Sequence, residues 1–318
     1  MADPTVPDLT GPLLRMSRRR RARDRRMRLV FTAAASLSII ITVAILGSLS
    51  FEAWGFLREV ERSSLWGIGW FPRRGLFDIS TLLIGTLLVS LIAMLVATPL
   101  GLGAAVYVSE YATPRVRRTV KPVLEILAGV PSVTLGYFAI SFITPNLLQP
   151  FLGSDRVSFF NLASAGLAVG ILTLPLVASV SEDALRAVPV ALREAAYGLG
   201  ARKWEVSTRV VFPAAVSGVV AALVIGLSRA IGETMVVAIA SGATGGSLRA
   251  VNPLQPGQTM TAAMAALGVG TDQVAGGAGT SAAAAFQSLF FVGLLLFFLT
   301  LALNLVGDRF VRRVRERY

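Results

Sequence analysis

Apolar residues in this chain gather into long stretches that are almost free of charge. A helix needs about 20 apolar residues to cross the hydrocarbon core of a bilayer. Six stretches reach that length, at about Leu29–Phe51, Ile79–Val108, Val120–Thr144, Asn161–Val180, Ala214–Ala240 and Phe286–Val306. The pattern therefore predicts an all-α integral membrane protein with six transmembrane helices.

The basic residues lie mostly in short blocks that border these stretches. With both termini on one side, 23 of the 30 Lys and Arg residues fall on that side, six on the other, and Arg229 inside a span. Loops rich in Lys and Arg stay in the cytoplasm, so both termini are predicted to be cytoplasmic. The chain then divides into a basic tail (1–28), a first transmembrane helix (29–51), a transmembrane core (76–310) with a polar cytoplasmic loop (181–213), and a second basic tail (311–318).

Two segments outside the spans are harder to assign. Residues 250–285 are nearly uncharged, and Asn252-Pro253 and Gln255-Pro256 favour an external loop with a short helix, while a re-entrant pass stays open. Residues 52–78 carry Trp54, Trp66 and Trp70, which is typical of an amphipathic piece at the outer membrane interface.

Composition supports a membrane protein and removes several functions. Charged residues make up only 15% of the chain, against about 25% in soluble domains. The net charge of +12 does not call for a nucleic-acid partner, because the predicted topology explains where the basic residues lie. The chain has no Cys and no His, which excludes disulfides, the usual catalytic triads and most transition-metal sites.

Neither of the two lysines, Lys121 and Lys203, follows a glycine, so the chain has no G-x4-G-K phosphate loop. We therefore expect no enzymatic activity and no cofactor in this chain. If transport is driven by ATP, a separate ATPase must bind the ATP and magnesium.

The polar loop at 181–213 carries a spaced motif. Glu194-Ala195-Ala196 is followed by Gly200 and then, after nine residues, by Val210-Val211-Phe212-Pro213. A short helix with small residues and a terminal glycine offers a compact knob to a partner, and Pro213 is expected to begin the next helix. This stretch resembles the EAA motif of ABC importer permeases, with Val and Phe in place of the usual Ile and Leu.

A second resemblance concerns the substrate. Arg229-Ala230-Ile231-Gly232-Glu233-Thr234 is similar to the R-A-[IL]-G-E-T signature of phosphate permeases of the Pst system, and the following Met-Val-Val is similar to the PstC-type subunit. The stretch around Ser132 resembles A-G-[IV]-P-S-[IV], and Asn252-Pro253 with Thr259-Met260-Thr261 resembles the N-P…T-M-T loop of the same subunit.

These resemblances imply a type I ABC importer permease fold that carries inorganic phosphate. They imply four partners: a second permease subunit of the PstA type, two copies of a PstB-type ATPase, and an extracytoplasmic PstS-type binding protein. They place Arg229, Glu233, Thr234 and Ser132 on the substrate pathway, and Glu194, Ala195, Ala196, Gly200 and Phe212 at the contact with the ATPase.

Arg229 and Glu233 receive a further prediction from their spacing. Two residues four apart in one helix share a face, so the two side chains are expected to pair. Glu233 would then neutralise Arg229 until a passing phosphate competes for the guanidinium, whose donors match phosphate oxygens.

Other functions stay possible at this stage. A permease for molybdate or sulfate would also carry the EAA motif, although such permeases generally lack R-A-x-G-E-T. A secondary transporter driven by an ion gradient fits a membrane glutamate but leaves the EAA loop without a role. A rhomboid-like intramembrane hydrolase fails because His and metal ligands are missing.

Overall fold

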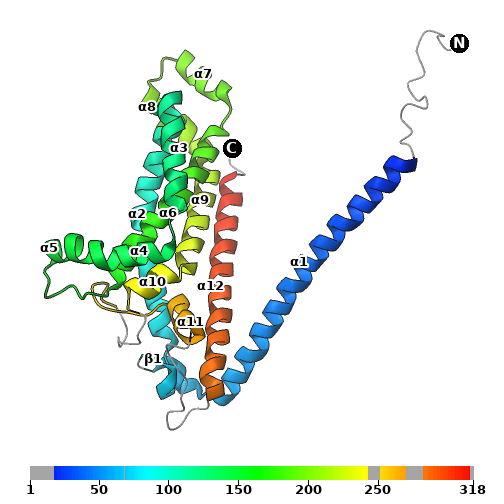
Figure 1. Cartoon of the computed structure of the whole chain (residues 1–318). Helices are drawn as coiled ribbons and strands as arrows, with labels where there is room; N and C mark the ends of the chain where they lie inside the picture. Colours follow the sequence, from blue (N-terminus) through cyan, green and yellow to red (C-terminus); the bar gives the residue numbers. More distant parts are fainter. Residues whose placement is uncertain (1–17, 68, 243–250, 270–281, 316–318) are drawn as a thin grey trace. The chain divides into compact units, whose positions relative to one another are not determined.

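The structure, a computed structural model, describes residues 18–67, 69–242, 251–269 and 282–315 (Figure 1). The chain divides into two compact units, residues 1–51 and residues 52–318. Most of the predicted N-terminal tail, the end of the C-terminal tail, Arg249 and residues 270–281 of the segment 250–285 lie outside the described residues.

The helix α1 (Arg18–Glu59) makes up the described part of the first unit and ends in the second. It contains the predicted first span and continues past it by two turns. Leu29, Phe31, Ile40 and Val43 are all exposed on it, so the helix is apolar around its circumference. This pattern is typical of a helix surrounded by lipid.

Residues 52–78 fold into a small hairpin cap. After α1 come the 3-10 helix η2 (Arg62–Trp66), the strand β1 (Trp70–Phe71), the 3-10 turn η3 (Pro72–Arg74) and the strand β2 (Leu76–Phe77), which pairs antiparallel with β1. Trp70 is only 2% exposed and packs edge-on against Phe77. The prediction of an interfacial amphipathic piece is therefore wrong for Trp70, which is a core residue, whereas Trp54 and Trp66 are exposed.

Asp78 joins the hairpin cap to the second span. Its side chain accepts hydrogen bonds from Ser80 N and Oγ, from Thr81 Oγ1 and from Gly69 N, and so it caps the first turn of α2. Burial tends to raise the pKa of Asp78, but these hydrogen bonds outweigh it and hold the pKa below its ordinary value.

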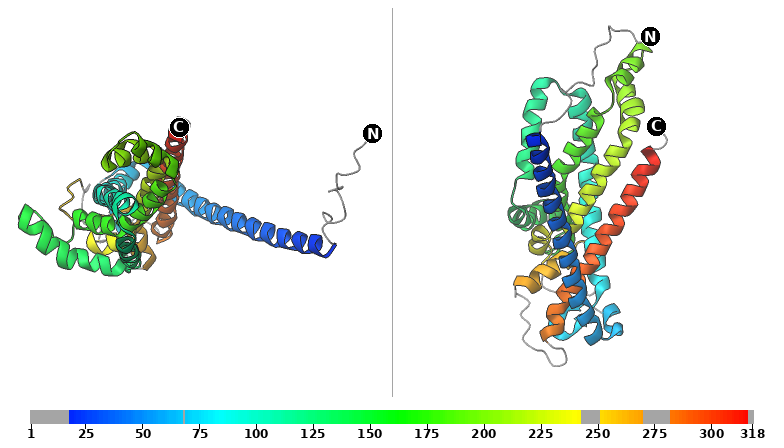
Figure 2. Two further views of the ribbon diagram at one scale, coloured as in Figure 1. Left: turned by 90° about the horizontal axis from the view of Figure 1, so that it is seen from above. Right: turned by 90° about the vertical axis from the view of Figure 1, so that its right-hand side faces the viewer.

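Four long helices build the bundle: α2 (Ile79–Val106), α6 (Leu162–Arg186), α9 (Phe212–Gly232) and α12 (Ala282–Arg315). Helix α6 packs on α2 and on α9, and α12 lies along α9 (Figure 1, Figure 2). Gly170 of α6 lies so close to α2 that a Cβ there would be 2.9 Å from the Ala93 carbonyl oxygen. Small residues of this kind let membrane helices approach backbone to backbone.

The predicted third span is not one helix. The helix α3 (Pro114–Ala128) ends at Gly129, and α4 (Ser132–Phe138) starts after Pro131 with a bend of 87°. The chain continues as the π-helix η5 (Ala139–Leu148) and α5 (Gln149–Leu152), which form an arm beside the bundle (Figure 1). Pro131 has no N–H to continue the hydrogen-bond ladder of α3, and this explains the position of the break.

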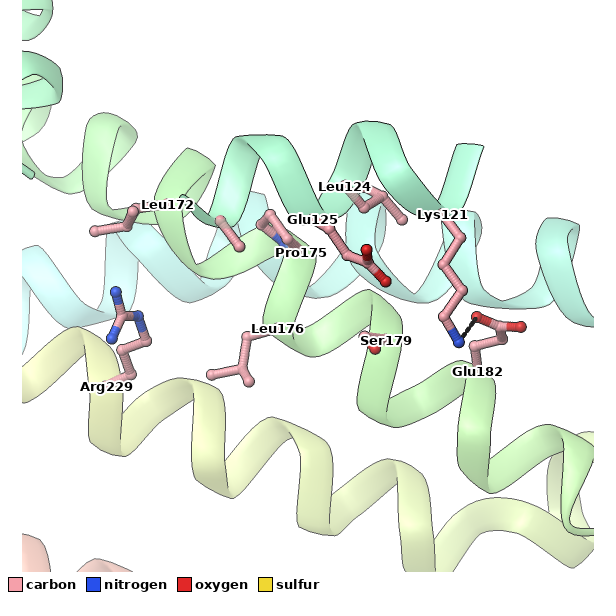
Figure 3. A pocket seen from close by; sticks show the side chains of 10 residues that line it. Lys121, Leu124, Glu125, Leu172, Pro175, Leu176, Ser179, Glu182 and Arg229 are labelled. Atoms are coloured by element: carbon pink, nitrogen blue, oxygen red, sulfur yellow. Dashed lines mark ion pairs between the residues drawn. The ribbon is translucent and has the colours of Figure 1, made fainter. Parts of the chain in front are cut away.

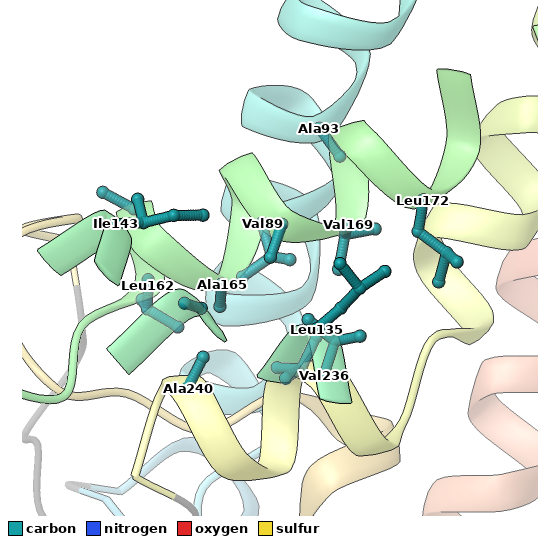
Figure 4. Close-up of a cluster of buried hydrophobic side chains, with 14 of the residues drawn as sticks. Val89, Ala93, Leu135, Ile143, Leu162, Ala165, Val169, Leu172, Val236 and Ala240 are labelled. Carbon is teal, nitrogen blue, oxygen red and sulfur yellow. The ribbon is translucent and has the colours of Figure 1, made fainter. Parts of the chain in front are cut away.

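The predicted fifth span is broken as well. Helix α9 ends at Gly232, Glu233 is extended, and the short helix α10 (Met235–Ala240) follows. Helix α10 packs against α4, and Leu135 and Val236 of the main core cluster lie side by side between the two helices (Figure 4). The two broken spans therefore meet at their breaks.

The predicted cytoplasmic loop contains α7 (Val190–Gly198) and α8 (Lys203–Glu205). From Lys203 the chain stays helical through the π-helix η6 (Val206–Val211) and α9 to Gly232. Pro213 stands in the first turn of α9, as predicted, but the helical run that contains it already begins at Lys203. The wider turns of η6 let the helix pass a residue that cannot donate a hydrogen bond.

The described part of the segment 250–285 is a loop followed by the short helix α11 (Met260–Val269). The carbonyl oxygens of Pro253, Leu254 and Gln255 accept hydrogen bonds from the N–H groups of Ala163, Ser158 and Leu162. The loop thus supplies partners to the start of α6, whose first N–H groups have none inside the helix. The predicted loop with a short helix is confirmed for these residues.

Five helices in the described part of the chain are long and apolar enough to cross a membrane, and the bent pair α3–α4 gives a sixth span if it counts as one. The five comprise α1, α2 with the π-helix η4 (Tyr107–Tyr111), α6, the run from Lys203 to Gly232, and α12. The all-α membrane fold is confirmed.

Candidate functional site

A cavity of about 380 Å³ opens between α3, α6 and α9 (Figure 3). Most of its lining is apolar, but each helix contributes charged or polar side chains. The lining residues are Lys121, Leu124, Glu125, Ala128, Leu172, Pro175, Leu176, Ser179, Glu182 and Arg229. Sequence reasoning assigned only Arg229 from this set to the substrate pathway.

One end of the cavity carries a charged network. Lys121 Nζ lies 3.7 Å from Glu182 Oε2 and 3.9 Å from Asp183 Oδ1. Arg186 Nη1, one turn further along α6, lies 3.5 Å from Glu182 Oε1. The buried Glu182 carboxylate is therefore shared by two cations, one at each oxygen.

Arg229 lies toward the other end, beyond Leu172 and Leu176 (Figure 3). Its side chain is exposed, and among the described residues it forms no ion pair. Inserting a membrane-spanning helix with a guanidinium that has no carboxylate partner costs at least about 2.5–3.5 kcal/mol of free energy. Its five donors are available to an anion that enters the cavity.

Glu233 does not pair with Arg229, so that prediction is wrong. The spacing of four residues puts two side chains on one face only where the helix continues, and α9 ends at Gly232. Glu233 Oε1 instead accepts a hydrogen bond from Val236 N at 3.4 Å, in the first turn of α10. Its carbonyl oxygen accepts a 2.8 Å hydrogen bond from Thr261 Oγ1. The T-M-T segment thus helps to hold the break between α9 and α10 open.

Thr234 and Ser132 lie at the starts of the second halves of the two broken spans. Thr234 Oγ1 donates to the Gly232 carbonyl oxygen at 3.2 Å, and Ser132 is the first residue of α4. The structure brings α4 and α10 together, since a Cβ at Gly136 would be 3.2 Å from Val236 Cα. Neither Thr234 nor Ser132 lines the cavity with Arg229, and their place on the pathway stays a prediction.

The EAA residues lie on and around α7. Glu194 and Ala195 are exposed, whereas Ala196 and Phe212 are half-buried against a cluster that includes Leu185 and Val211. Phe212 therefore packs within its own chain, where it anchors the loop. The surface available to a partner consists of Glu194, Ala195 and several apolar residues that sequence reasoning did not select: Val190, Leu192, Leu199 and Trp204.

Gly200 has the backbone conformation that the motif predicts. Its φ is +81°, in the left-handed region, and a Cβ would meet no atom within 4 Å. The constraint on this residue is therefore backbone strain, not lack of space.

Arg193, just before Glu194, was not selected from the sequence. Its guanidinium donates to Glu110 Oε1 at 3.0 Å and to the carbonyl oxygens of Val188 and Leu185 at 2.6 and 2.8 Å. Glu110 belongs to η4 at the end of α2, so this contact ties α7 to α2. The two residues lie 83 positions apart, and no local pattern indicates the pair.

Two further cations meet the same end of α2. Arg117 of α3 donates to the carbonyl oxygens of Val108 and Ser109 at 2.7–3.0 Å. Lys203 Nζ lies 5.1 Å from the centre of the Tyr111 ring, within cation–π range. Helices α3, α7 and α8 are therefore all attached to η4 by positive charges.

Comparisons with known proteins agree with this architecture. Residues 97–318 match the family described as "Binding-protein-dependent transport system inner membrane component". The phosphate transport system permease protein PstC of Xylella fastidiosa (strain 9a5c) is 30% identical in an alignment of 309 positions that covers 91% of each chain. PstC 1 of Mycobacterium tuberculosis (strain H37Rv) is 36% identical over 249 residues, covering 73% of this chain and 72% of the relative.

Among solved structures, a chain of a bacterial ABC transporter involved in alginate import matches 92% of this chain and 99% of its own, with a TM-score of 0.63 and 17% identity. That likeness concerns the fold alone. The family match at residues 97–318 covers more than two thirds of this chain. The chain therefore belongs to the inner-membrane components of binding-protein-dependent ABC transport systems.

Proposed function

We propose that this chain is a permease subunit of an ABC importer for inorganic phosphate, with both termini in the cytoplasm. The observation that carries the proposal is Arg229, whose guanidinium lines a cavity between three membrane helices and forms no ion pair with any residue that the structure describes. The PstC names of the relatives support phosphate as the substrate. The excess of Lys and Arg on the side of the termini supports the orientation.

Arg229 would bind phosphate as it passes between α3, α6 and α9. A guanidinium can donate two parallel N–H bonds to two oxygens of a tetrahedral anion, which is stronger and more directional than contact with a point charge. Two cations and two carboxylates line the cavity, so its charges nearly balance. A balanced lining attracts an anion to one donor group without holding it too tightly to leave.

The exposed surface of α7, with Glu194, Ala195 and the following Leu199, would dock into an ATPase dimer of the PstB type. A second permease subunit of the PstA type would complete the pathway, and a PstS-type protein would deliver phosphate. In this scheme the partner ATPase binds ATP and magnesium, and this chain needs no cofactor.

Uptake of labelled phosphate by the reconstituted four-component transporter tests the proposal. Arg229→Gln should lower uptake about 10- to 100-fold, because a charge-assisted hydrogen bond contributes about 1.5–3 kcal/mol. Arg118→Gln is the matched control, since Arg118 is an exposed arginine of α3 outside the cavity lining. Near-normal uptake by an assembled Arg229→Gln transporter would contradict the proposed role of the cavity.

The substrate needs its own measurement. Excess unlabelled phosphate should abolish uptake of label, while equal concentrations of sulfate or molybdate should leave most of it. Inhibition by molybdate or sulfate as strong as that by phosphate would assign the transporter to another oxyanion.

A further inference from the structure

The cavity carries a second cation, Lys121, at the end away from Arg229 (Figure 3). We propose that Lys121 is a second binding station for the transported phosphate, and that Glu182 occupies its ammonium group while no anion is present. The inference rests on the proposed function, which supplies the anion, and adds a residue that the signature motifs do not include.

The contacts of Lys121 are loose enough to be exchanged. Its Nζ lies 3.7 Å from Glu182 and 3.9 Å from Asp183, whereas a tight charge-assisted N–H···O contact is about 2.7–2.9 Å. The Arg193–Glu110 pair, at 3.0 Å, is much closer to that range. The Lys121 side chain is also 39% exposed and has a flexible stem, so its ammonium group can turn toward the cavity.

Glu182 can release Lys121 without being left alone. Its side chain is only 4% exposed, and a buried carboxylate that loses its sole cation is strongly destabilised. Arg186 contacts the other carboxylate oxygen at 3.5 Å and does not depend on Lys121. When Lys121 turns to an anion, Arg186 therefore still neutralises Glu182.

The order of the two stations follows from the chain. Lys121 contacts Glu182 near the end of α6, close to the predicted cytoplasmic side, whereas Arg229 is near the end of α9. Glu125 lies between them in Figure 3 and offsets part of their positive charge. A phosphate that leaves Arg229 toward the cytoplasm would meet Lys121 next, and the return of Glu182 to Lys121 would release it.

Because the chain contains no cysteine, the Lys121→Cys variant offers one defined position in this chain for modification, in a transporter assembled with partner subunits freed of accessible cysteine. Uptake should fall about tenfold in this variant. A methanethiosulfonate reagent that attaches an ethylammonium group should restore most of it, and one that attaches an ethylsulfonate should not. Saturating phosphate should slow the modification severalfold compared with chloride at the same ionic strength.

Lys203→Cys is the matched control, because Lys203 is the other lysine of the chain and lies outside the cavity lining. Phosphate should leave its modification rate unchanged. Lys121→Arg should retain most of the uptake, which keeps the test valid if Lys121→Cys assembles poorly.

Three results would overturn the inference: normal uptake by Lys121→Gln, equal rescue by the ammonium and sulfonate reagents, or no protection by phosphate. If any of these occurs while Arg229→Gln is inactive, the second station is wrong and the proposed function stands. If Arg229→Gln is also fully active, the proposed function itself fails.

Discussion

The hairpin cap and the EAA loop lie at opposite ends of the bundle and are held by different forces (Figure 1). In the hairpin cap, Phe56, Trp70 and Phe77 are each at most 2% exposed, and the ring centroid of Phe77 lies 5.0 Å from that of Phe56 and 5.8 Å from that of Trp70. Around the EAA loop the buried residues are mostly small aliphatic side chains, and the links between elements are the charged contacts of Arg117, Arg193 and Lys203.

The two kinds of contact respond differently to a partner. When buried aromatic rings separate, water offers no contacts that replace those between the rings, so their stabilising free energy is lost. Hydrogen bonds and ion pairs near a surface can be exchanged for contacts with water or with another protein at small net cost. We infer that the hairpin cap is a fixed anchor and that the EAA loop is the end that a partner can reshape.

The largest effect is expected in the hairpin cap. Trp70→Ala should lower the free energy of unfolding by about 3–5 kcal/mol, because it leaves a cavity among buried rings. Trp66→Ala is the control, since Trp66 is 67% exposed, and should change it by no more than about 0.5 kcal/mol. Thermal unfolding of the subunit in lipid nanodiscs measures both. Equal losses would show that the cap is not a packed unit.

A smaller effect is expected at the EAA loop. Glu110→Ala or Arg193→Ala should cost about 2 kcal/mol, because each leaves a partly buried charged group without its ion-pair partner. The double variant should lose less than the sum of the two, which a double-mutant cycle detects. Unlike Trp70→Ala, these variants should also raise the ATP hydrolysed per phosphate transported.

Arg115→Ala, which removes an exposed arginine of α3, is the control for the charge itself. If it uncouples ATP hydrolysis as strongly as Arg193→Ala does, the link between α7 and α2 has no special role.

The smallest effect is expected at Gly200. Gly200→Ala should cost about 1 kcal/mol through its positive φ, and Gly200→Asn should cost less because Asn tolerates that conformation. Gly198→Ala is the control, because it adds the same methyl group to equally open space inside α7. It should leave the free energy of unfolding unchanged or raise it. Co-purification of the ATPase with each variant checks whether strain at Gly200 loosens docking. Weaker docking in both alanine variants would point to the added methyl group instead.

The positions of the membrane spans could be predicted from the sequence, because they depend on the length of each apolar stretch and on where the charged residues lie along the chain. It did not predict the breaks in the third and fifth spans, since apolar residues continue on both sides of Pro131 and Gly232. A residue pattern with the same period on each side of a break does not distinguish a bend of 87° from a straight helix.

Sequence reasoning selected only those site residues that belong to a short local motif. Arg229 was selected from a motif and lines the cavity, and its role there stays a prediction. Its partner was misassigned because the conformation of Glu233 depends on Thr261, 28 positions away. Likewise, Lys121 was counted for topology alone, because its contact with Glu182 joins two different helices. Contacts between distant segments leave no periodic trace in the sequence.

The uninterrupted helix from Lys203 to Gly232 has a mechanical consequence. At about 1.5 Å per residue, Arg229 lies about 39 Å along the axis from Lys203. A tilt of about 5° around the end at Lys203 would carry Arg229 sideways by about 3 Å, close to the length of one hydrogen bond. If Arg229 binds phosphate as proposed, a tilt of this size would move the guanidinium from one phosphate oxygen to the next, so a small rotation at the EAA loop would be transmitted to the anion along the length of the helix.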